Sequence, residues 1–262
     1  MGAYTLQDPP SGEMDCETVG IPFPDCQIKI LNPDANGMGE IVTKHPYMFS
    51  GYYNNKKAFK ESIKNGWMHT GDAGFLDKNN RLTVIDRVDD IATKSDGIKF
   101  SPQNIENKLK FSPYVGEAVI LGADKPYLTA IICIRFSIVS KLAEKWQLPF
   151  TSYTGLASDK KIYDLIQSEI DKVNKNLPKN LKIKKFLLLF KELEADDGEL
   201  TRTRKVRRSV INDRYKSLID SLYKDKSVAK INTEVTYEDG RKGKINASME
   251  IRNLKISSIG NK

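Results

Sequence analysis

Residues 86–107 read DRVDDIATKSDGIKFSPQNIEN and separate two parts of the sequence that differ in character. Upstream of this stretch the chain consists of short β-type runs and turn residues, whereas downstream it alternates between β-type runs and helical periods. Pro102 predicts the start of a helix, since proline is tolerated in a first helical turn. We therefore predict an α+β protein with a boundary near residues 86–96.

The upstream part predicts strands joined by turns. Gln27–Leu31 and Glu40–Thr43 carry alternating or β-branched residues, and the segment NPDANGMG between them is typical of a hairpin connection. Arg81–Asp86 predicts a further strand after the turn DKNN. The single helical period here is short and lies near residues 56–64.

The downstream part predicts a mixed core. Its helices are expected at residues 102–111, 159–177 and 206–223, because apolar residues recur there every three or four positions. Its strands are expected at 116–122, 128–134 and 186–190, and again around the turn EDGRKGK within 231–256.

Composition excludes several classes of site. The 262 residues include 42 basic and 34 acidic ones, a formal charge of +8, which suits an acidic partner without identifying it. Cys16, Cys26 and Cys133 form neither a disulfide framework nor a zinc pattern, and a reducing compartment is the simpler interpretation. His45 and His69 lack a third ligand at a useful spacing, so we predict no metal site.

Two stretches could present polar groups to a ligand. GWMHTGD at residues 66–72 predicts a turn with a carboxylate at its tip, which can accept two hydrogen bonds from a sugar diol; the alternative is an ordinary Asx-type turn. DRVDD at 86–90 offers the planar donors of Arg87 and a polar pivot at Asp89. Its alternative is a surface ion pair.

Two further stretches could lie near phosphate groups or a narrow ligand. The glycine in KSDGIK, residues 94–99, allows close approach of a ligand to the backbone, and the alternative is a plain turn. GELTRTRKVRR at 198–208 has five basic residues in its last seven. It could bind phosphate or nucleic acid, or it could be a solvated basic face at a helix start.

Taken in order, these four stretches, together with MFSGYYNN at residues 48–55, resemble the adenylate-forming enzymes. The resemblance is closest to long-chain fatty-acid CoA ligases of the bubblegum type and covers the chain from about residue 18. It implies a β-rich last lobe of the large adenylating domain at 1–88 and a small mobile α/β domain at 89–230, followed by a β-type appendage at 231–262.

The resemblance also implies roles for single residues in the adenylation step. Asp72 resembles the carboxylate that holds the ribose hydroxyls of ATP, and Arg87 resembles the arginine that contacts the same ribose. Lys205 resembles the catalytic lysine that reaches the acyl carboxylate and the α-phosphate.

For the second step, the resemblance implies that Asp89 is the hinge about which the small domain rotates. Gly97 and Lys99 resemble residues beside the tunnel for the pantetheine arm of CoA. The implied reaction joins a fatty acid to ATP as an acyl-adenylate and then transfers the acyl group to the CoA thiol.

This sequence lacks two segments typical of the family, the Ser/Thr/Gly-rich phosphate loop and the Tyr-Gly-x-Thr-Glu segment that helps to hold Mg²⁺. We therefore expect the C-terminal portion of a synthetase, with Mg²⁺ bound mainly by the missing domain. We also expect this portion to be inactive alone towards fatty acid, ATP and CoA.

Two alternatives to the ligase interpretation remain. The basic runs at 182–191 and 202–208 would also suit a basic binding module for nucleic acid or an anionic membrane, although the ligase interpretation predicts no nucleic-acid partner. The second alternative is a split subunit that completes its site with another chain. For a ligase fragment we also expect self-association, through apolar surface that the missing part would cover. With no signal pattern in its first fifteen residues, the chain is expected in the cytoplasm, with a peripheral membrane contact left open.

Overall fold

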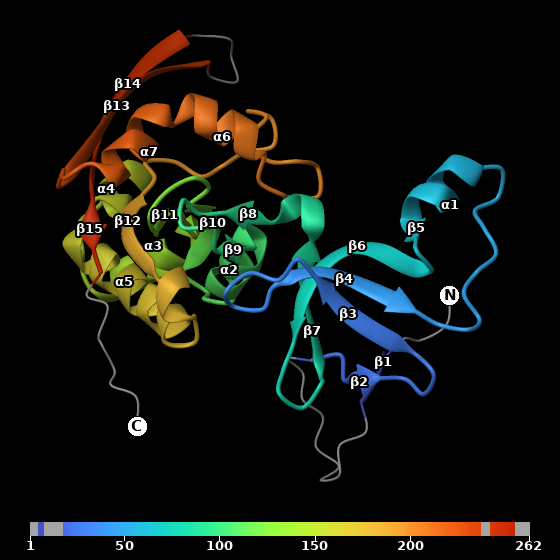
Figure 1. Ribbon diagram of the computed structural model, residues 1–262. Helices are drawn as coiled ribbons and strands as arrows, with labels where there is room; N and C mark the ends of the chain where they lie inside the picture. Colours follow the sequence, from blue (N-terminus) through green and yellow to red (C-terminus); the bar gives the residue numbers. More distant parts are fainter. Residues whose placement is uncertain (1–4, 8–17, 237–241, 255–262) are drawn as a thin grey trace. The chain divides into compact units, whose positions relative to one another are not determined.

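The computed structural model describes residues 5–7, 18–236 and 242–254 of the chain (Figure 1). It divides into two compact units, Met1–Asn104 and Ile105–Lys262. Both helices and strands are abundant, which confirms the predicted α+β class. The predicted boundary between residues 88 and 89 marks a hinge. The division into compact units does not test a hinge, so this boundary stays a prediction.

Unit 1 is built on an antiparallel sheet in the order β3-β4-β6-β5, with β7 also paired to β6. The hairpin expected around NPDANGMG is confirmed, because Leu31 pairs with Glu40 across it. The elements of this unit are β1 (Thr5–Leu6), β2 (Ile21–Pro22), β3 (Gln27–Leu31), β4 (Gly39–Lys44), α1 (Lys56–Ser62), β5 (Ile63–Lys64), β6 (Trp67–Leu76), β7 (Leu82–Arg87), the 3₁₀ helix η1 (Val88–Asp90), β8 (Ala92–Thr93) and β9 (Lys99–Phe100).

The stretch GWMHTGD is not the loop tip that the sequence predicts. Gly66 ends a turn, and residues 67–72 lie inside the ten-residue strand β6, which pairs with β4 on one side and β7 on the other. Gly71 has a φ of +70°, and the register with β7 shifts between Ala73 and Gly74. The turn-forming residues therefore produce a bulge within a strand, because pairing on both sides keeps the chain extended.

Unit 2 contains a four-stranded sheet in the order β10-β11-β12-β15. Its elements are α2 (Pro102–Lys110), which begins at the end of unit 1, β10 (Val115–Leu121), β11 (Leu128–Ile134), α3 (Phe136–Lys145), α4 (Tyr153–Ala157), α5 (Lys160–Lys175), the 3₁₀ helix η2 (Lys179–Leu181), β12 (Ile183–Leu188), α6 (Arg208–Arg214), α7 (Lys216–Tyr223), β13 (Val228–Thr236), β14 (Lys242–Glu250) and β15 (Arg252–Asn253).

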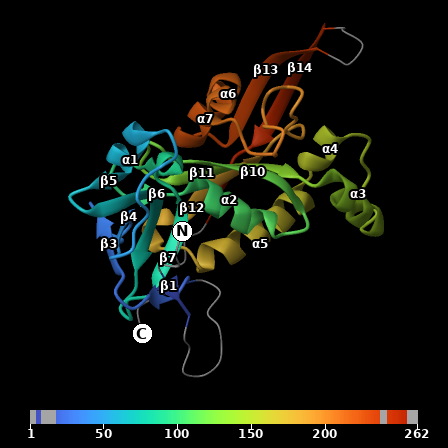
Figure 2. The same cartoon turned by 90° about the vertical axis from the view of Figure 1, so that its right-hand side faces the viewer.

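The sheet of unit 2 is buried on both faces, which explains its continuous apolar strands. On one face, Tyr163 of α5 packs on Phe186 with ring centroids 5.7 Å apart and donates its hydroxyl hydrogen to the Glu250 carbonyl. The opposite face packs against α6, α7 and the β13–β14 pair (Figure 2). Apolar residues on that side include Val119, Ile131, Leu187, Ile211, Leu218, Leu222, Ala229 and Met249.

The helix predicted over residues 206–223 is in fact two helices. Both α6 and α7 keep the expected apolar face, but the chain leaves helical geometry at Tyr215, with φ −105° and ψ 20°. The Tyr215 side chain is buried, and its hydroxyl donates to the Glu199 carboxylate at 2.5 Å. An apolar period continues across such a break, so the pattern alone could not reveal it.

The strands expected after residue 230 are present as β13 and β14, which pair over their full lengths. Ala229, Ile231, Ala247 and Met249 belong to the same core as α7. The predicted turn EDGRKGK lies largely outside the described residues. Within the described residues, the structure contains no helix with the length and apolarity required to cross a membrane.

Candidate functional site

Asp72 and Arg87 face each other across strands β6 and β7. Their Cα positions are paired in the register, and Arg87 Nη1 donates to Asp72 Oδ1 at 2.9 Å. The side chains remain 37% and 61% exposed, respectively, so the pair itself is worth only about 0–1 kcal/mol. Exposed carboxylate and guanidinium groups held side by side can bind a polyhydroxyl ligand, because one accepts hydrogen bonds and the other donates them.

Two neighbours that the sequence did not single out position this pair. Thr70 donates from its hydroxyl to the Ile41 carbonyl at 2.8 Å and accepts the Asp72 backbone N–H at 3.0 Å. A Cβ at Gly71 would lie 2.9 Å from Arg87 Nη2, so any other residue here would displace the guanidinium group. The order Thr-Gly-Asp was the available signal, although it had suggested a turn.

Asp89 lies in η1, directly after β7, and is exposed. Both carboxylate oxygens of the preceding Asp86 accept hydrogen bonds. Oδ1 accepts one from the Arg87 backbone N–H at 2.9 Å, and Oδ2 accepts one from the Ser101 hydroxyl. The residue predicted as the hinge therefore follows a fixed strand end.

The KSDGIK stretch forms the predicted turn, between β8 and β9. Gly97 has a φ of +82°, and a Cβ there would meet nothing within 4 Å. Lys94 Nζ donates to Asp96 at 2.7 Å; this hydrogen bond is the main cause that lowers the pKa of Asp96. Lys99 is engaged within the unit, since its backbone N–H donates to Asp34 and its ammonium donates to the Asn32 carbonyl, both at 2.8 Å.

Lys205 lies at the end of a tight loop in unit 2, residues 201–205, which we call the Lys205 loop. The Thr201 N–H donates to the Lys205 carbonyl at 2.8 Å, and the Lys205 N–H donates to the Thr201 hydroxyl at 3.0 Å. The side chain is exposed, and its ammonium has no hydrogen-bond or ion-pair partner among the residues that the structure describes. Leu200 and Val206 form a bridge at the base of the loop.

A buried carboxylate lies beneath this loop. Glu199 is fully buried and accepts hydrogen bonds from Arg214, Tyr215 and Lys191. Burial, and then the neighbouring carboxylate, raises the pKa of Tyr215, which keeps its hydroxyl protonated. Burial would lower the pKa of Lys191, but the hydrogen bonds to Asp197 and Glu199 outweigh it and raise that pKa. Glu199 was not predicted from the sequence, although it is the acidic residue that precedes the basic run.

Two of the basic side chains in the runs at 182–191 and 202–208 are used inside unit 2. Arg208 Nη2 donates to both oxygens of the buried Glu106 carboxylate at 2.8 Å, and Lys191 bonds Glu199. Desolvation raises the pKa of Glu106, with Arg208 opposing it. The runs at 182–191 and 202–208 therefore present less unpaired positive charge than their number of Lys and Arg residues suggests.

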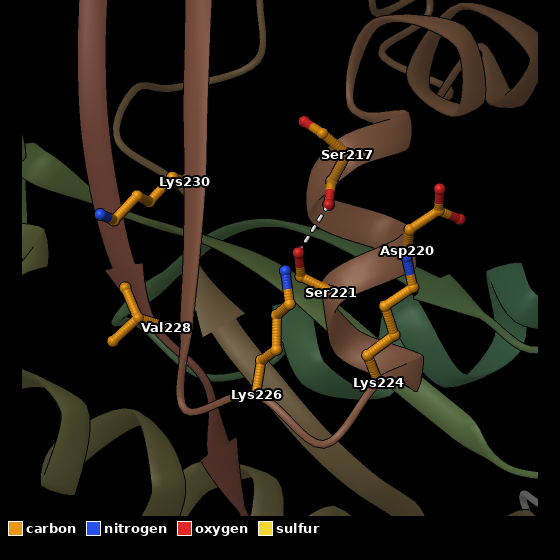
Figure 3. Close-up of a pocket in the computed structure, with 7 residues that line it drawn as sticks. All are labelled: Ser217, Asp220, Ser221, Lys224, Lys226, Val228 and Lys230. Atoms are coloured by element: carbon orange, nitrogen blue, oxygen red, sulfur yellow. Dashed lines mark hydrogen bonds between the residues drawn. The ribbon is translucent and has the colours of Figure 1, made fainter.

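The structure has one hollow near these residues and another apart from them. One of about 220 Å³ in unit 1 lies among the segments that carry Asp72, Asp89 and Gly97, and is lined by Met38, Gly39, Glu40, Ala73, Val88, Ile91, Thr93 and Lys99. The other, of about 510 Å³, lies between α7 and β13 in unit 2 (Figure 3) and is lined by Ser217, Asp220, Ser221, Lys224, Lys226, Val228 and Lys230. None of the predicted site residues lines the second hollow.

The predicted site residues thus fall into two groups. Asp72 and Arg87 are in contact, and Asp89, Gly97 and Lys99 lie on nearby segments of the same unit. Lys205 belongs to unit 2. Within the described part of the chain, no group of three His, Cys, Asp or Glu side chains could hold a metal ion.

Gly97 can be compared with Gly37, a half-buried turn glycine with a φ of +79° where an added Cβ would likewise meet nothing within 4 Å. We expect alanine at either position to cost about 1–2 kcal/mol, the penalty of the left-handed region. Urea unfolding of Gly97→Ala and Gly37→Ala checks this. If Gly97→Ala were several kcal/mol worse, packing rather than backbone strain would determine the residue at this position.

Known proteins provide the context for this geometry. The family model for the AMP-binding enzyme C-terminal domain matches residues 89–227. The long-chain-fatty-acid–CoA ligase ACSBG2 of Gallus gallus is 30% identical over 257 residues, covering 91% of this chain and 33% of the relative. The long-chain-fatty-acid–CoA ligase FadD15 of Mycobacterium tuberculosis is 30% identical over 211 residues, with 79% and 34% covered.

Solved structures share the fold. The adenylation domain of a carboxylate reductase from Mycobacterium chelonae superposes with a TM-score of 0.52 at 21% identity, covering 75% of this chain and 31% of that one. The corresponding domain from Segniliparus rugosus, solved with AMP and a co-purified carboxylic acid, gives 0.53 at 18%, with 78% and 32% covered. The chain spans about a third of the length of the two fatty-acid CoA ligases named above. It belongs to the AMP-binding superfamily of adenylate-forming enzymes.

Proposed function

We propose that this chain forms the C-terminal portion of an ATP-dependent long-chain fatty-acid CoA ligase. The observation that carries the proposal is the exposed Asp72–Arg87 pair on β6 and β7, in a chain whose family match begins at residue 89. In the first step the fatty carboxylate attacks the α-phosphorus of ATP and releases pyrophosphate. In the second, the CoA thiol attacks the acyl carbonyl and releases AMP.

Each residue then has a stated task. The Asp72 carboxylate accepts hydrogen bonds from the ribose hydroxyls, and Arg87 keeps that carboxylate in place while donating to the ribose. Lys205 brings its ammonium to the oxygens that gain charge as the carboxylate meets the phosphate. Its contribution is electrostatic, through positive charge placed beside those oxygens.

Exchange between the two steps requires motion. We assign the pivot of this motion to Asp89. We assign Gly97 and Lys99 to the face that is presented to CoA in the second step. Enzymes that change sites between two steps use one mobile part at both stages. Mg²⁺ would neutralise phosphate charge; no carboxylate cluster that suits it occurs among the described residues, so we assign it no ligand here. A cytoplasmic location stays a prediction.

The test uses a hybrid ligase in which this chain replaces the aligned segment of the Gallus gallus relative. We expect Asp72→Ala to raise the KM for ATP about 10- to 100-fold, the effect of losing hydrogen bonds to a charged group. The matched control is Asp77→Ala, which breaks the neighbouring Asp77–Arg81 pair of 2.7 Å in the same hairpin.

Initial rates of pyrophosphate release at varied ATP concentrations measure both variants. Equal KM values for Asp72→Ala and the unmodified hybrid would contradict the proposal. We also expect no pyrophosphate release by the 262-residue chain alone, and robust turnover would show that the adenylation site lies within it.

A further inference from the structure

Glu199 stands out because both oxygens of a fully buried carboxylate are saturated. Oε1 accepts from Arg214 Nη1 at 2.7 Å and from the Tyr215 hydroxyl at 2.5 Å. Oε2 accepts from Lys191 Nζ at 2.9 Å and from the Glu194 backbone N–H at 3.2 Å. Four donors on one buried carboxylate fix its position, since each carboxylate oxygen offers about two acceptor sites.

The donors come from both sides of the Lys205 loop. Lys191 and Glu194 precede Glu199, whereas Arg214 and Tyr215 lie at the break between α6 and α7. Glu199 also accepts the Arg207 backbone N–H on its carbonyl at 2.9 Å, so its main chain joins the two ends of the loop. The carboxylate therefore ties the start of the loop to the helices that follow it.

The loop contains few other restraints. Residues 202–205 are exposed, and Arg204 has a φ of +59°, in the left-handed region. Hydrogen bonds between Thr201 and Lys205 hold the turn itself, but not its direction. Its attachment to the core comes from the Leu200–Val206 bridge next to Glu199 and from Arg208, which donates to Glu106.

We infer that Glu199 is a positioning residue for Lys205: its four-donor anchorage fixes the base of the loop and so the direction in which the lysine ammonium is presented. The effect on catalysis rests on the proposed function, while the effect on the loop does not. A lysine has a long flexible stem, so its effective placement depends on how firmly its backbone is held.

Amide hydrogen exchange on the complete 262-residue chain tests the anchorage. Glu199→Gln keeps the shape of the side chain but removes its charge. We expect exchange of the Thr201, Lys205 and Arg207 amides to become about tenfold faster or more. The matched control is Glu117→Gln, a similarly buried carboxylate on β10 that pairs with Lys110 at 2.9 Å. It should leave these amides within about twofold.

Unchanged exchange at those amides in Glu199→Gln would overturn the inference. If that variant does not fold, Tyr215→Phe removes one of the four donors and keeps the ring. It should accelerate the same amides by a smaller factor, and no acceleration would again refute the anchorage.

The hybrid ligase separates this inference from the proposed function. We expect Glu199→Gln to lower kcat for acyl-adenylate formation about tenfold, with the KM for ATP and the thioester step nearly unchanged. If Lys205→Ala has no effect in that assay, the proposed function fails. If Lys205→Ala slows adenylation but Glu199→Gln does not, the positioning role fails.

Discussion

Replacing Lys205 by alanine is expected to slow acyl-adenylate formation about 100-fold or more, the typical effect of removing one preorganised donor from a developing charge. The ammonium is exposed and unpartnered among the described residues, which leaves it available for a substrate. The thioester step from preformed acyl-adenylate should be unaffected, because the role proposed for Lys205 is confined to the first step. Pyrophosphate release and CoA thioester formation by the hybrid ligase measure the two steps separately.

The neighbouring Arg202 provides the control. It lies on the same exposed loop and likewise has no partner among the described residues. Arg202→Ala removes a similar charge from the same surface and should change adenylation less than about threefold. Equal losses in the two variants would mean that general basic charge, rather than the position of one ammonium, promotes the reaction.

Replacing Glu199 by alanine is expected to lower the free energy of unfolding by about 3 kcal/mol, near the lower end for breaking a buried ion pair. The carboxylate is fully buried, and its removal leaves the Tyr215 hydroxyl without its acceptor in the core. Lys191 and Arg214 keep 21% and 36% exposure and can turn to water, which limits the loss.

Urea unfolding of the complete chain measures this change. Glu194→Ala is the matched control, since that side chain is exposed on the same segment and should change stability by less than about 0.5 kcal/mol. A loss below about 1 kcal/mol for Glu199→Ala would show that the cluster adds little to the folded state.

The regular elements could be predicted because each has a local cause. Strands β3, β4, β10 and β11 follow alternating or continuous apolar runs, and α2 begins at Pro102 as expected. Helix α5 begins after Asp159, which accepts the Lys161 N–H at 2.7 Å, and ends before Pro178. These features depend on neighbours in sequence, which the pattern contains.

The two errors have non-local causes. GWMHTGD carries turn residues, but strands β4 and β7 pair on both sides and hold it as a strand. At the break, the Tyr215 hydroxyl donates to Glu199, a residue sixteen positions earlier. Neither partner is visible in a local window, so tertiary contacts overrode the local signal.

The candidate site shows the same division. The resemblance implied that Asp72 and Arg87 contact the same ribose, and the structure brings them into contact because β6 and β7 pair in that register. Glu199 went unnoticed, because nothing in sequence tells a buried anchor from a solvated acid. The basic run after it was visible, but the consumption of Arg208 by Glu106 was not.

The most direct test of the account is the distance between its two units in the working hybrid ligase. Spin labels are attached at Tyr53→Cys in unit 1 and Phe111→Cys in unit 2, at positions whose native side chains are 95% and 87% exposed. The native Cys26 and Cys133 are buried, and Cys16 is replaced by serine. We predict that the label distance differs between the acyl-adenylate and CoA-bound states, and that Asp89→Pro suppresses the change. One unchanging distance in every state would contradict a rotation that brings Lys205 to a nucleotide held by Asp72 and Arg87.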